Sequence, residues 1–340
     1  MSDSLRQTGQ NSANVHIRGI ALMYHRILKL DYDPRRMCVS PEHFEEHVRV
    51  IKKFGRAVQM RDLAVDLQNK VPGNLEMAIT LDDGYNDSAR YAKPILEKNA
   101  VPATFFIISG AIGSKAEFFR DSLEQVILAA RSLPERLEIT LGEKHCNWKI
   151  KPEGPCPEVD YSEPAADPAE IQEALSRSGL YRTLTPLLSV MTFEGQMEIL
   201  RQLADWATID LRTRPEYLPL TEEELGELAG CPLFEMGAHT VHHPVLTRLS
   251  AGDQRHEIGN CKMALERMTG RPIESFSYPH GEYDQETVEI IKRLNYRSAC
   301  TVRARPVKSD TDPFLLPRFM PLDWDGDQFE RQLRRWLSMD

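Results

Sequence analysis

The chain has 340 residues, of which 41% are hydrophobic and 27% are charged, as is typical of a soluble globular protein. Its formal net charge of -9 argues against a nucleic-acid binder, which would usually carry a basic footprint. Residues 1–15 are polar and lack the apolar core of a secretory signal, and no apolar run approaches the roughly 18 residues of a membrane span. The six cysteines are scattered without a C-x-x-C pair, so we expect free thiols, a reducing compartment and a cytoplasmic protein.

Short apolar segments alternate with helical segments through most of the chain, which predicts a parallel α/β sheet or barrel. The predicted strands cover residues 17–24, 75–81, 101–108, 233–238, 273–278, 296–302 and 313–320. The predicted helices between and after them cover residues 41–54, 60–67, 87–98, 221–228, 252–269, 284–294 and 328–337.

The alternation is interrupted between residues 110 and 214. The elements predicted there are a helix over 118–130, a hairpin of 137–141 and 145–150 that turns at Gly142-Glu143, a proline-rich acidic linker over 151–168, and helices over 169–176 and 186–210. We therefore divide the chain into a disordered tail (1–16), a first part of the barrel (17–109), an insertion (110–214) and a second part of the barrel (215–340). The insertion is expected to cover the active-site cleft and select the substrate, or else to be an oligomer contact or a stabilising cap.

A doubled aspartate follows the second predicted strand. The apolar run from Met77 to Leu81 ends abruptly in Asp82, Asp83 and Gly84. Two neighbouring carboxylates at the end of a buried strand are electrostatically costly unless a cation or a proton is shared there. Gly84 permits a sharp turn or a close approach of the backbone to a ligand. This pattern indicates a metal-dependent active site.

A histidine pair can complete a set of metal ligands. His239 and His243 are four residues apart, so on one helical turn they would share a face and could hold one cation. With a carboxylate from Asp82 or Asp83, they would leave positions open for water and substrate, as catalytic metal sites do. The alternative is that these histidines merely cap or line a loop. Polar residues recur where predicted strands end, which is where barrel enzymes place their sites: His25, Asp82, Asp83, His239 and His280.

Three motifs resemble those of the polysaccharide deacetylase family, the NodB-like group of carbohydrate esterase type that includes chitooligosaccharide deacetylases. Thr80-Leu81-Asp82-Asp83-Gly84 resembles its T-F-D-D-G motif, and His239-Thr240-Val241-His242-His243 resembles its H-[ST]-x-x-H motif. Phe276-Ser277-Tyr278-Pro279-His280-Gly281 resembles the F-x-Y-P-x-G form of its third motif. The resemblance implies a distorted (β/α) barrel of about seven strands, which here would carry an inserted helical and hairpin subdomain.

The resemblance also implies roles for the motif residues. Asp83, His239 and His243 would bind a divalent metal ion, and Asp82 would be the general base that activates a metal-bound water. The oxyanion would be held by the metal and by a backbone N–H in the turn from Tyr278 to Gly281, that of His280. Tyr278, Gly281 and Tyr85 are counted with His280 as residues that bind the substrate.

The chain departs from the usual family pattern at two positions. It has no histidine after His280, where family members usually carry their general acid. Permuted members use an N-terminal Tyr-His motif instead, and Tyr24-His25 fits that variant, so we assign His25 as the general acid. The alternative for His25 is a hydrogen-bonded histidine at a strand end. Ser277 stands where many members have an arginine that tunes the catalytic aspartate.

A further histidine pattern is interpreted differently. His43-Phe44-Glu45-Glu46-His47 matches the H-x-x-E-H pattern of inverted zinc proteases. Because Phe44, Val48 and Ile51 mark the buried stripe of this predicted helix, we place His43 and His47 on its solvated face.

The predicted function is metal-dependent hydrolysis of an N-acetyl group from an amino sugar, with release of acetate. The substrate would be a glycan or a glycan precursor of polysaccharide biosynthesis. Two histidines and a carboxylate suit zinc, but also cobalt, iron or nickel. The alternatives are a catalytically inactive carbohydrate-binding module on the same fold and a deacylase of a non-sugar amide. No nucleic-acid partner and no membrane span are expected.

Overall fold

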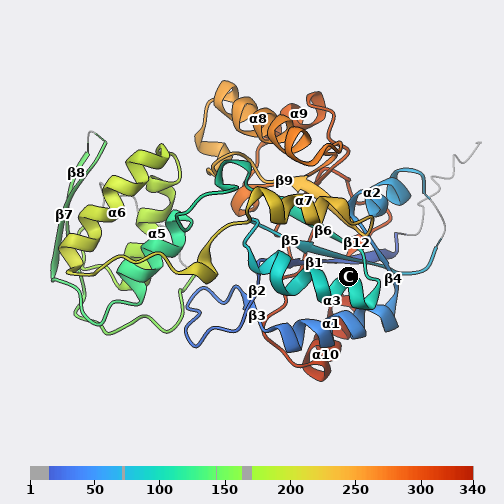
Figure 1. Cartoon of the computed structure of the whole chain (residues 1–340), viewed down its shortest axis with the longest axis horizontal. Helices are drawn as coiled ribbons and strands as arrows, with labels where there is room; N and C mark the ends of the chain where they lie inside the picture. The colour runs from blue at the N-terminus through green and yellow to red at the C-terminus, as the bar shows by residue number, and fades with distance from the viewer. Residues whose placement is uncertain (1–14, 71–72, 143, 163–170, 340) are drawn as a thin grey trace, which may run out of the picture.

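The computed structural model describes residues 15–70, 73–142, 144–162 and 171–339 (Figure 1). The predicted tail over residues 1–16 lies outside this part of the chain except for its last two residues. Among the described residues, no helix is both long and apolar enough to cross a membrane.

A mostly parallel sheet, curled into a half-barrel, holds the larger part of the molecule together. Its strands follow the order β11-β10-β9-β6-β5-β1-β12, and β4 pairs with the first half of β5. The strands are β1 (Ile17–Tyr24), β4 (Arg56–Val58), β5 (Glu76–Leu81), β6 (Ala103–Ile107), β9 (Phe234–Ala238), β10 (Ser275–Ser277), β11 (Ser298–Cys300) and β12 (Val307–Lys308). Only the pair of β1 and β12 is antiparallel among these strands. All six residues of β5 are buried, because both faces of such a sheet are covered.

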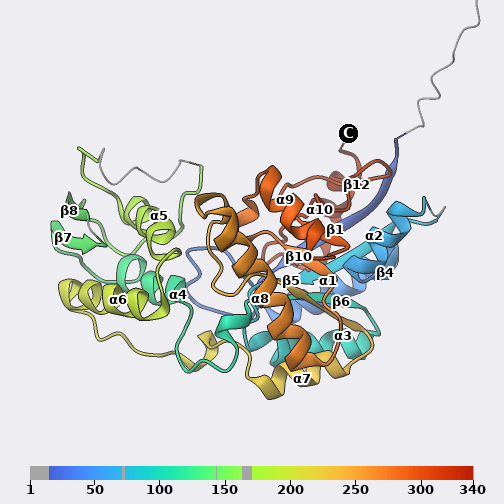
Figure 2. The same cartoon turned by 90° about the horizontal axis from the view of Figure 1, so that it is seen from above.

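Helices surround this sheet, and their buried faces pack against its side chains in two hydrophobic clusters (Figures 1 and 2). They are α1 (Pro41–Phe54), α2 (Met60–Gln68), α3 (Lys93–Asn99), α7 (Glu222–Gly230), α8 (Ala251–Thr269), α9 (Gln285–Arg293) and α10 (Gly326–Leu337). The predicted serine cap of α1 is present, since the Ser40 side chain accepts a hydrogen bond from the backbone N–H of His43.

An irregular segment links the two edges of the half-barrel. Leu316 forms a bridge with Cys300 of β11, and Phe319 forms a bridge with Leu22 of β1. The prediction of a regular strand over residues 313–320 is therefore wrong. Pro317 has no backbone N–H, so a continuous ladder cannot run through this segment.

The elements between residues 119 and 207 build a separate hydrophobic core of their own. They are α4 (Phe119–Leu123), a π-helical turn (Glu124–Leu128), the hairpin β7 (Arg136–Leu141) and β8 (Lys144–Lys149), α5 (Arg177–Leu188) and α6 (Phe193–Ala207). Figures 1 and 2 show this group beside the sheet. Alternate residues of β7 are buried, so one face of the predicted hairpin packs on this core and the other faces solvent. Glu143 of the predicted turn lies outside the described residues.

Two predicted helices of the insertion are wrong. Residues 171–176, the described part of the helix predicted over 169–176, are not helical, and Ser176 instead caps α5. The helix predicted over 186–210 is divided between α5 and α6, because the Thr192 side chain caps a new helix by accepting from the N–H of Gly195. Ser176 and Thr192 mark the true starts of the two helices, but the helical periodicity of the surrounding residues concealed these caps.

The interpretation of His47 as a solvated residue is also wrong. His47 is fully buried, its Nδ1 lies 3.1 Å from the Tyr24 hydroxyl and its Nε2 lies 2.7 Å from the backbone oxygen of Trp324. Because Nε2 can meet that oxygen only as a donor, the neutral ring accepts at Nδ1. Both nitrogens are thus engaged, and His47 is a structural residue between α1 and the C-terminal segment.

The separate core of the insertion predicts local rather than global unfolding. Leu200 of α6 is fully buried in this core, so Leu200→Ala should weaken the insertion by about 2–5 kcal/mol. Hydrogen exchange followed by mass spectrometry should show faster exchange over residues 119–207 and unchanged protection in β1, β5 and β6. Gln202→Ala, on the exposed side of the same helix, is the control. Equal loss of protection in the sheet would mean that the two cores unfold as one unit.

Candidate active site

The polar residues predicted at strand ends meet at one edge of the sheet, because the strands that carry them are parallel. β1 ends just before His25, β5 just before Asp82 and Asp83, and β9 just before His239. A cavity of about 580 Å³ opens over this edge, and all four of these residues line it. This is the carboxyl-terminal edge, where barrel enzymes carry their sites.

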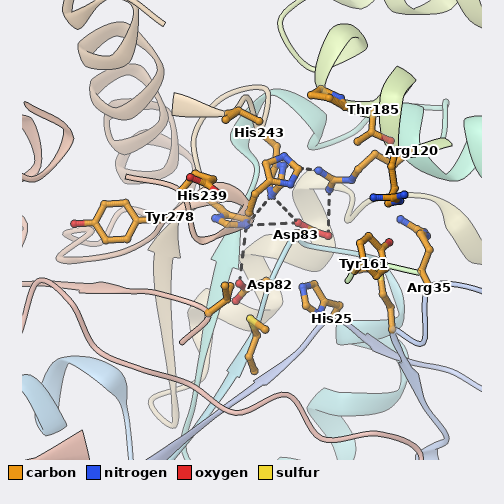
Figure 3. A pocket seen from close by; sticks show the side chains of 18 of the residues that line it. His25, Arg35, Asp82, Asp83, Arg120, Tyr161, Thr185, His239, His243 and Tyr278 are labelled. Atoms are coloured by element: carbon orange, nitrogen blue, oxygen red, sulfur yellow. Dashed lines mark hydrogen bonds and ion pairs between the residues drawn. The ribbon is translucent and has the colours of Figure 1, made fainter. Parts of the chain in front are cut away.

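Asp83, His239 and His243 form the group in the described chain that could hold a metal ion. One potential ligand atom from each lies within 4.8 Å of the others, and all three residues are buried. The Nε2 atoms of both histidines lie 3.6 Å from Oδ1 of Asp83 (Figure 3). Burial lowers the pKa of both histidines, which favours the neutral imidazole that binds metals. Two nitrogen donors and one oxygen donor in a closed cluster fit a divalent cation.

Outer contacts hold two of these ligands in place. The ring of His239 lies with Nδ1 2.8 Å from the backbone oxygen of Ser277, so Nδ1 carries the proton and Nε2 faces Asp83 with a free lone pair. The loop between the two histidines is fixed by Glu257, which accepts the backbone N–H groups of Val241 and His242 at 3.0 and 2.9 Å. Glu257 was not singled out in the sequence, since nothing in its own helix distinguishes it from a surface acid.

Several residues of the site adopt left-handed backbone conformations without being glycine. They are Asp83 (φ 74°), Thr240 (φ 65°), His243 (φ 60°) and His280 (φ 58°). Such conformations cost on the order of 1–3 kcal/mol each and persist only where the surroundings impose them. Their concentration at one edge of the sheet is an independent sign of a functional site.

Asp82 is held by an arginine that the sequence analysis missed. Arg318 donates to Oδ1 of Asp82 at 2.7 Å and to Oδ2 at 2.8 Å, and the Ser277 hydroxyl donates to Oδ2 at 3.1 Å. Burial is the largest single effect and would raise the pKa of Asp82, but Arg318, His239 and His25 act together in the opposite direction and lower this pKa to about 2. The resemblance led us to note a missing arginine at Ser277, and in the structure the guanidinium beside Asp82 comes from Arg318 instead. The sequence feature that could have indicated this buried ion pair is the single arginine within the otherwise apolar segment from Phe314 to Met320.

His25 faces the same cavity beside the two aspartates (Figure 3). Its Nδ1 is buried and has no hydrogen-bond partner among the described residues. Burial lowers the pKa of His25, while the carboxylates of Asp83 and Asp82 act in the opposite direction. A simple structural histidine would have its buried ring nitrogen satisfied, so this orphaned atom supports a chemical role.

The remaining predicted residues are divided between the cavity and its supports. Tyr278 and His280 line the cavity, and the His280 ring packs against His243 with centroids 4.6 Å apart. Gly281 and Tyr85 are not among the lining residues. A Cβ on Gly281 would lie 2.3 Å from Cγ2 of Val302, so this glycine is required for close packing of the turn. Tyr85 is buried, and its hydroxyl donates to Asp121 at 2.9 Å, which places it behind the site.

The insertion supplies one wall of the cavity. Its lining residues are Arg120, Tyr161, Tyr181, Arg182, Thr185 and Pro186. Arg120 reaches furthest, with Nη2 3.3 Å from Oδ2 of Asp83, and Figure 3 shows it between the insertion and the metal-ligand group. Arg120 could not be predicted from the sequence, because its partners are distant in the chain and its own segment carries no motif.

Comparisons with known proteins agree with this architecture. The profile of the family described as "Polysaccharide deacetylase" matches residues 70–133 and 207–299. The unmatched residues between these ranges lie within the predicted insertion. A Bacillus subtilis (strain 168) protein, named "Putative polysaccharide deacetylase YxkH", is 30% identical over 107 residues, which are 31% of this chain and 37% of that protein. This chain therefore spans little more than a third of that relative's length.

Two solved structures share the fold over nearly the whole chain. IcaB from Ammonifex degensii has a TM-score of 0.57 and 18% identity, with 95% of this chain and 98% of that chain covered. The Streptococcus pyogenes deacetylase PplD in complex with acetate has a TM-score of 0.54 and 17% identity, with 95% and 100% covered. At these identities the likeness establishes the fold, a curled α/β half-barrel. Together, the family profile and this likeness show that the chain resembles polysaccharide deacetylases and has the fold of the NodB type.

Proposed function

We propose that this protein hydrolyses the N-acetyl group of an amino sugar in a glycan or glycan precursor and releases acetate, using a divalent metal ion. The observation that carries the proposal is the arrangement at the cavity floor. There, the carboxylate of Asp82 is fixed by Arg318 next to the Asp83, His239 and His243 cluster. The match to the polysaccharide deacetylase profile over residues 70–133 and 207–299 supports the same reaction class.

Asp83, His239 and His243 would hold the metal ion, with zinc preferred and cobalt, iron or nickel as alternatives. When bound, such an ion lowers the pKa of a water ligand towards neutrality and polarises the acetamide carbonyl. The three residues leave the cavity side of the cluster open to water and substrate.

Asp82 is suited to take a proton from the attacking water. A pKa of about 2 keeps the carboxylate ionised at all ordinary pH values. Two hydrogen bonds from Arg318 and one from Ser277 fix the position of the carboxylate. They do not occupy all of its lone pairs, so an oxygen can still accept a proton. A carboxylate of such low pKa is a weak base, so transfer depends on a water that is already acidified.

His25 would give a proton to the departing amine. It lines the cavity, and its Nδ1 atom has no hydrogen-bond partner in the described chain. The backbone N–H of His280 would stabilise the oxyanion, since the turn from Tyr278 to Gly281 borders the same cavity. The left-handed conformation of His280 would orient this turn.

The proposed reaction is tested by acetate release. Purified protein is incubated with N-acetylated chitooligosaccharides, peptidoglycan fragments and non-sugar acetamides, before and after treatment with a chelator. Acetate should be released from at least one sugar substrate, lost on chelation and restored by zinc or cobalt. Asp82→Asn should reduce kcat by about 10²–10⁴-fold with metal content unchanged. Binding of sugars without acetate release would indicate a carbohydrate-binding module, and release only from the non-sugar amides would indicate another deacylase.

Arg318→Met should change the pH dependence of activity. Without the guanidinium, burial dominates and the pKa of Asp82 rises, so the acid limb of kcat/KM should move to higher pH by about one unit or more. Loss of the buried partner should also reduce the free energy of unfolding at pH 7 by about 3–5 kcal/mol. Because the folded pKa lies below the unfolded value, this stabilising effect is present above pH 4 and lost as the pH falls towards 2. Arg305→Met, a matched change at an exposed arginine, should alter neither quantity.

His25→Ala should lower kcat by about 10²–10⁴-fold, because the leaving amine loses its proton donor. The metal content, measured by elemental analysis, should stay at the wild-type level, since His25 is not in the ligand group. His256→Ala removes an exposed histidine and should leave kcat unchanged. Wild-type kcat in His25→Ala would exclude His25 as the general acid.

A further inference from the structure

Arg120 is a buried cation from the insertion that contacts two of the three proposed metal ligands. Its side chain is 8% exposed, Nη2 lies 3.3 Å from Oδ2 of Asp83, and Nη1 contacts Nδ1 of His243 (Figure 3). No other arginine of the described chain is in ion-pair distance of Asp83. The Asp83 carboxylate is therefore compensated by a positive charge that comes from outside the sheet.

The contact with Arg120 determines where the proton of His243 lies. A guanidinium can only donate, so Nδ1 of His243 must accept and the proton of the neutral ring is on Nε2. This assignment agrees with the neighbouring contacts. Nε2 of His243 lies 3.0 Å from Nε2 of His239, whose own proton is on Nδ1 and is donated to Ser277. Arg120, His243, His239 and Ser277 thus form one consistent chain of donors and acceptors.

In this arrangement His239 already presents a lone pair at Nε2, but His243 does not. The Nε2 lone pair of His239 accepts the hydrogen carried by Nε2 of His243, the atom that faces Asp83, and becomes available to a metal ion once that hydrogen leaves. For Nε2 of His243 to become a ligand, its proton must leave and a proton must be gained at Nδ1. Arg120 must therefore give up its contact with Nδ1, because two donors cannot face each other.

We propose that Arg120 is a displaceable cation that competes with the metal ion for Asp83 and His243 and thereby sets the metal affinity of the site. The inference rests on the proposed function in one respect, namely that Asp83, His239 and His243 hold the metal. It connects the insertion to the chemistry by charge, in addition to the wall that the insertion forms.

The surroundings of Arg120 favour a movement of its side chain alone. The backbone of α4 is fixed, because Asp121 and Glu124 pair with Arg35 and Glu117 pairs with Arg214. The guanidinium itself borders the cavity of about 580 Å³. A long flexible side chain can therefore swing from His243 into this space while the helix stays in place.

Metal affinity is the first test. Metal-free protein is titrated with zinc in competition with a chromophoric chelator, and the dissociation constant is compared for wild type, Arg120→Gln and Arg120→Lys. Arg120→Gln should bind zinc at least about tenfold more tightly, because the competing charge is removed. Arg120→Lys keeps the charge and should stay closer to wild type. Arg248→Gln removes an exposed arginine of the same cavity and is the control, with unchanged affinity.

The tautomer of His243 is the second test, and it does not depend on activity. The ¹⁵N shifts of the imidazole nitrogens should show the Nε2–H form in metal-free wild type and the Nδ1–H form after zinc is added. Near-UV circular dichroism establishes that each variant is folded. If Arg120→Gln does not fold, the comparison is made with Arg120→Lys.

The outcomes separate this inference from the function it rests on. Zinc binding that is unchanged in Arg120→Gln, or weaker by about 10–100-fold as for the loss of a supporting contact, would overturn the role of Arg120. An Nδ1–H form of His243 in metal-free wild type would do the same. A wild-type protein that binds no zinc, cobalt, iron or nickel would instead overturn the proposed metal site.

Discussion

Two adjacent carboxylates, Asp82 and Asp83, are buried at the end of β5, and the rest of the site is arranged around compensating their charge. An isolated buried carboxylate loses several kcal/mol of solvation, so each needs its own cationic partner. Asp82 receives a permanent one in Arg318, which also donates to Thr80 and Ser277 and is fully buried. Asp83 faces the two histidines and Arg120, a set that can exchange one cation for another.

The irregular segment at the seam of the half-barrel follows from this constraint. Arg318 reaches Asp82 from a segment that lies 236 residues later in the chain. The bridges at Leu316 and Phe319 fix the segment on both sides of Arg318, and its Nε donates to the backbone oxygen of Thr301 at 3.1 Å. A regular strand would alternate its side chains without meeting the geometry of the carboxylate. Small Ser277 on β10 leaves the space that the guanidinium fills.

The polar residues at the strand ends could be predicted from the sequence, and the structure brings His25, Asp82, Asp83, His239 and His243 to one cavity. His25, Asp82, Asp83 and His239 could be found because they follow apolar runs, and His243 because of its spacing of four residues from His239. Arg318 and Arg120 could not be found in this way, because their function lies in contacts between distant segments. His47 shows the converse error: its helix face was inferred from the periodicity of α1 alone, whereas α10 and the Trp324 loop cover it. The helix boundary at Thr192 was hidden because helical periodicity continues through it.

The contrast between the two cations gives the two acids their different chemical properties. Arg318 holds Asp82 through two short, parallel hydrogen bonds, so the carboxylate is fixed and ionised, which suits the role of base proposed for it. Arg120 holds Asp83 through one longer contact from a side chain that borders open space, so Asp83 can release it. If the two arrangements were exchanged, Asp82, the proposed base, would be mobile, and Asp83, the proposed metal ligand, would be blocked by a tightly held arginine. The order of the two residues at the strand end therefore matters. Asp83, in its left-handed conformation, lies 3.6 Å from Nε2 of both histidines, whereas Asp82 approaches only His239, at 3.9 Å, and is paired with Arg318.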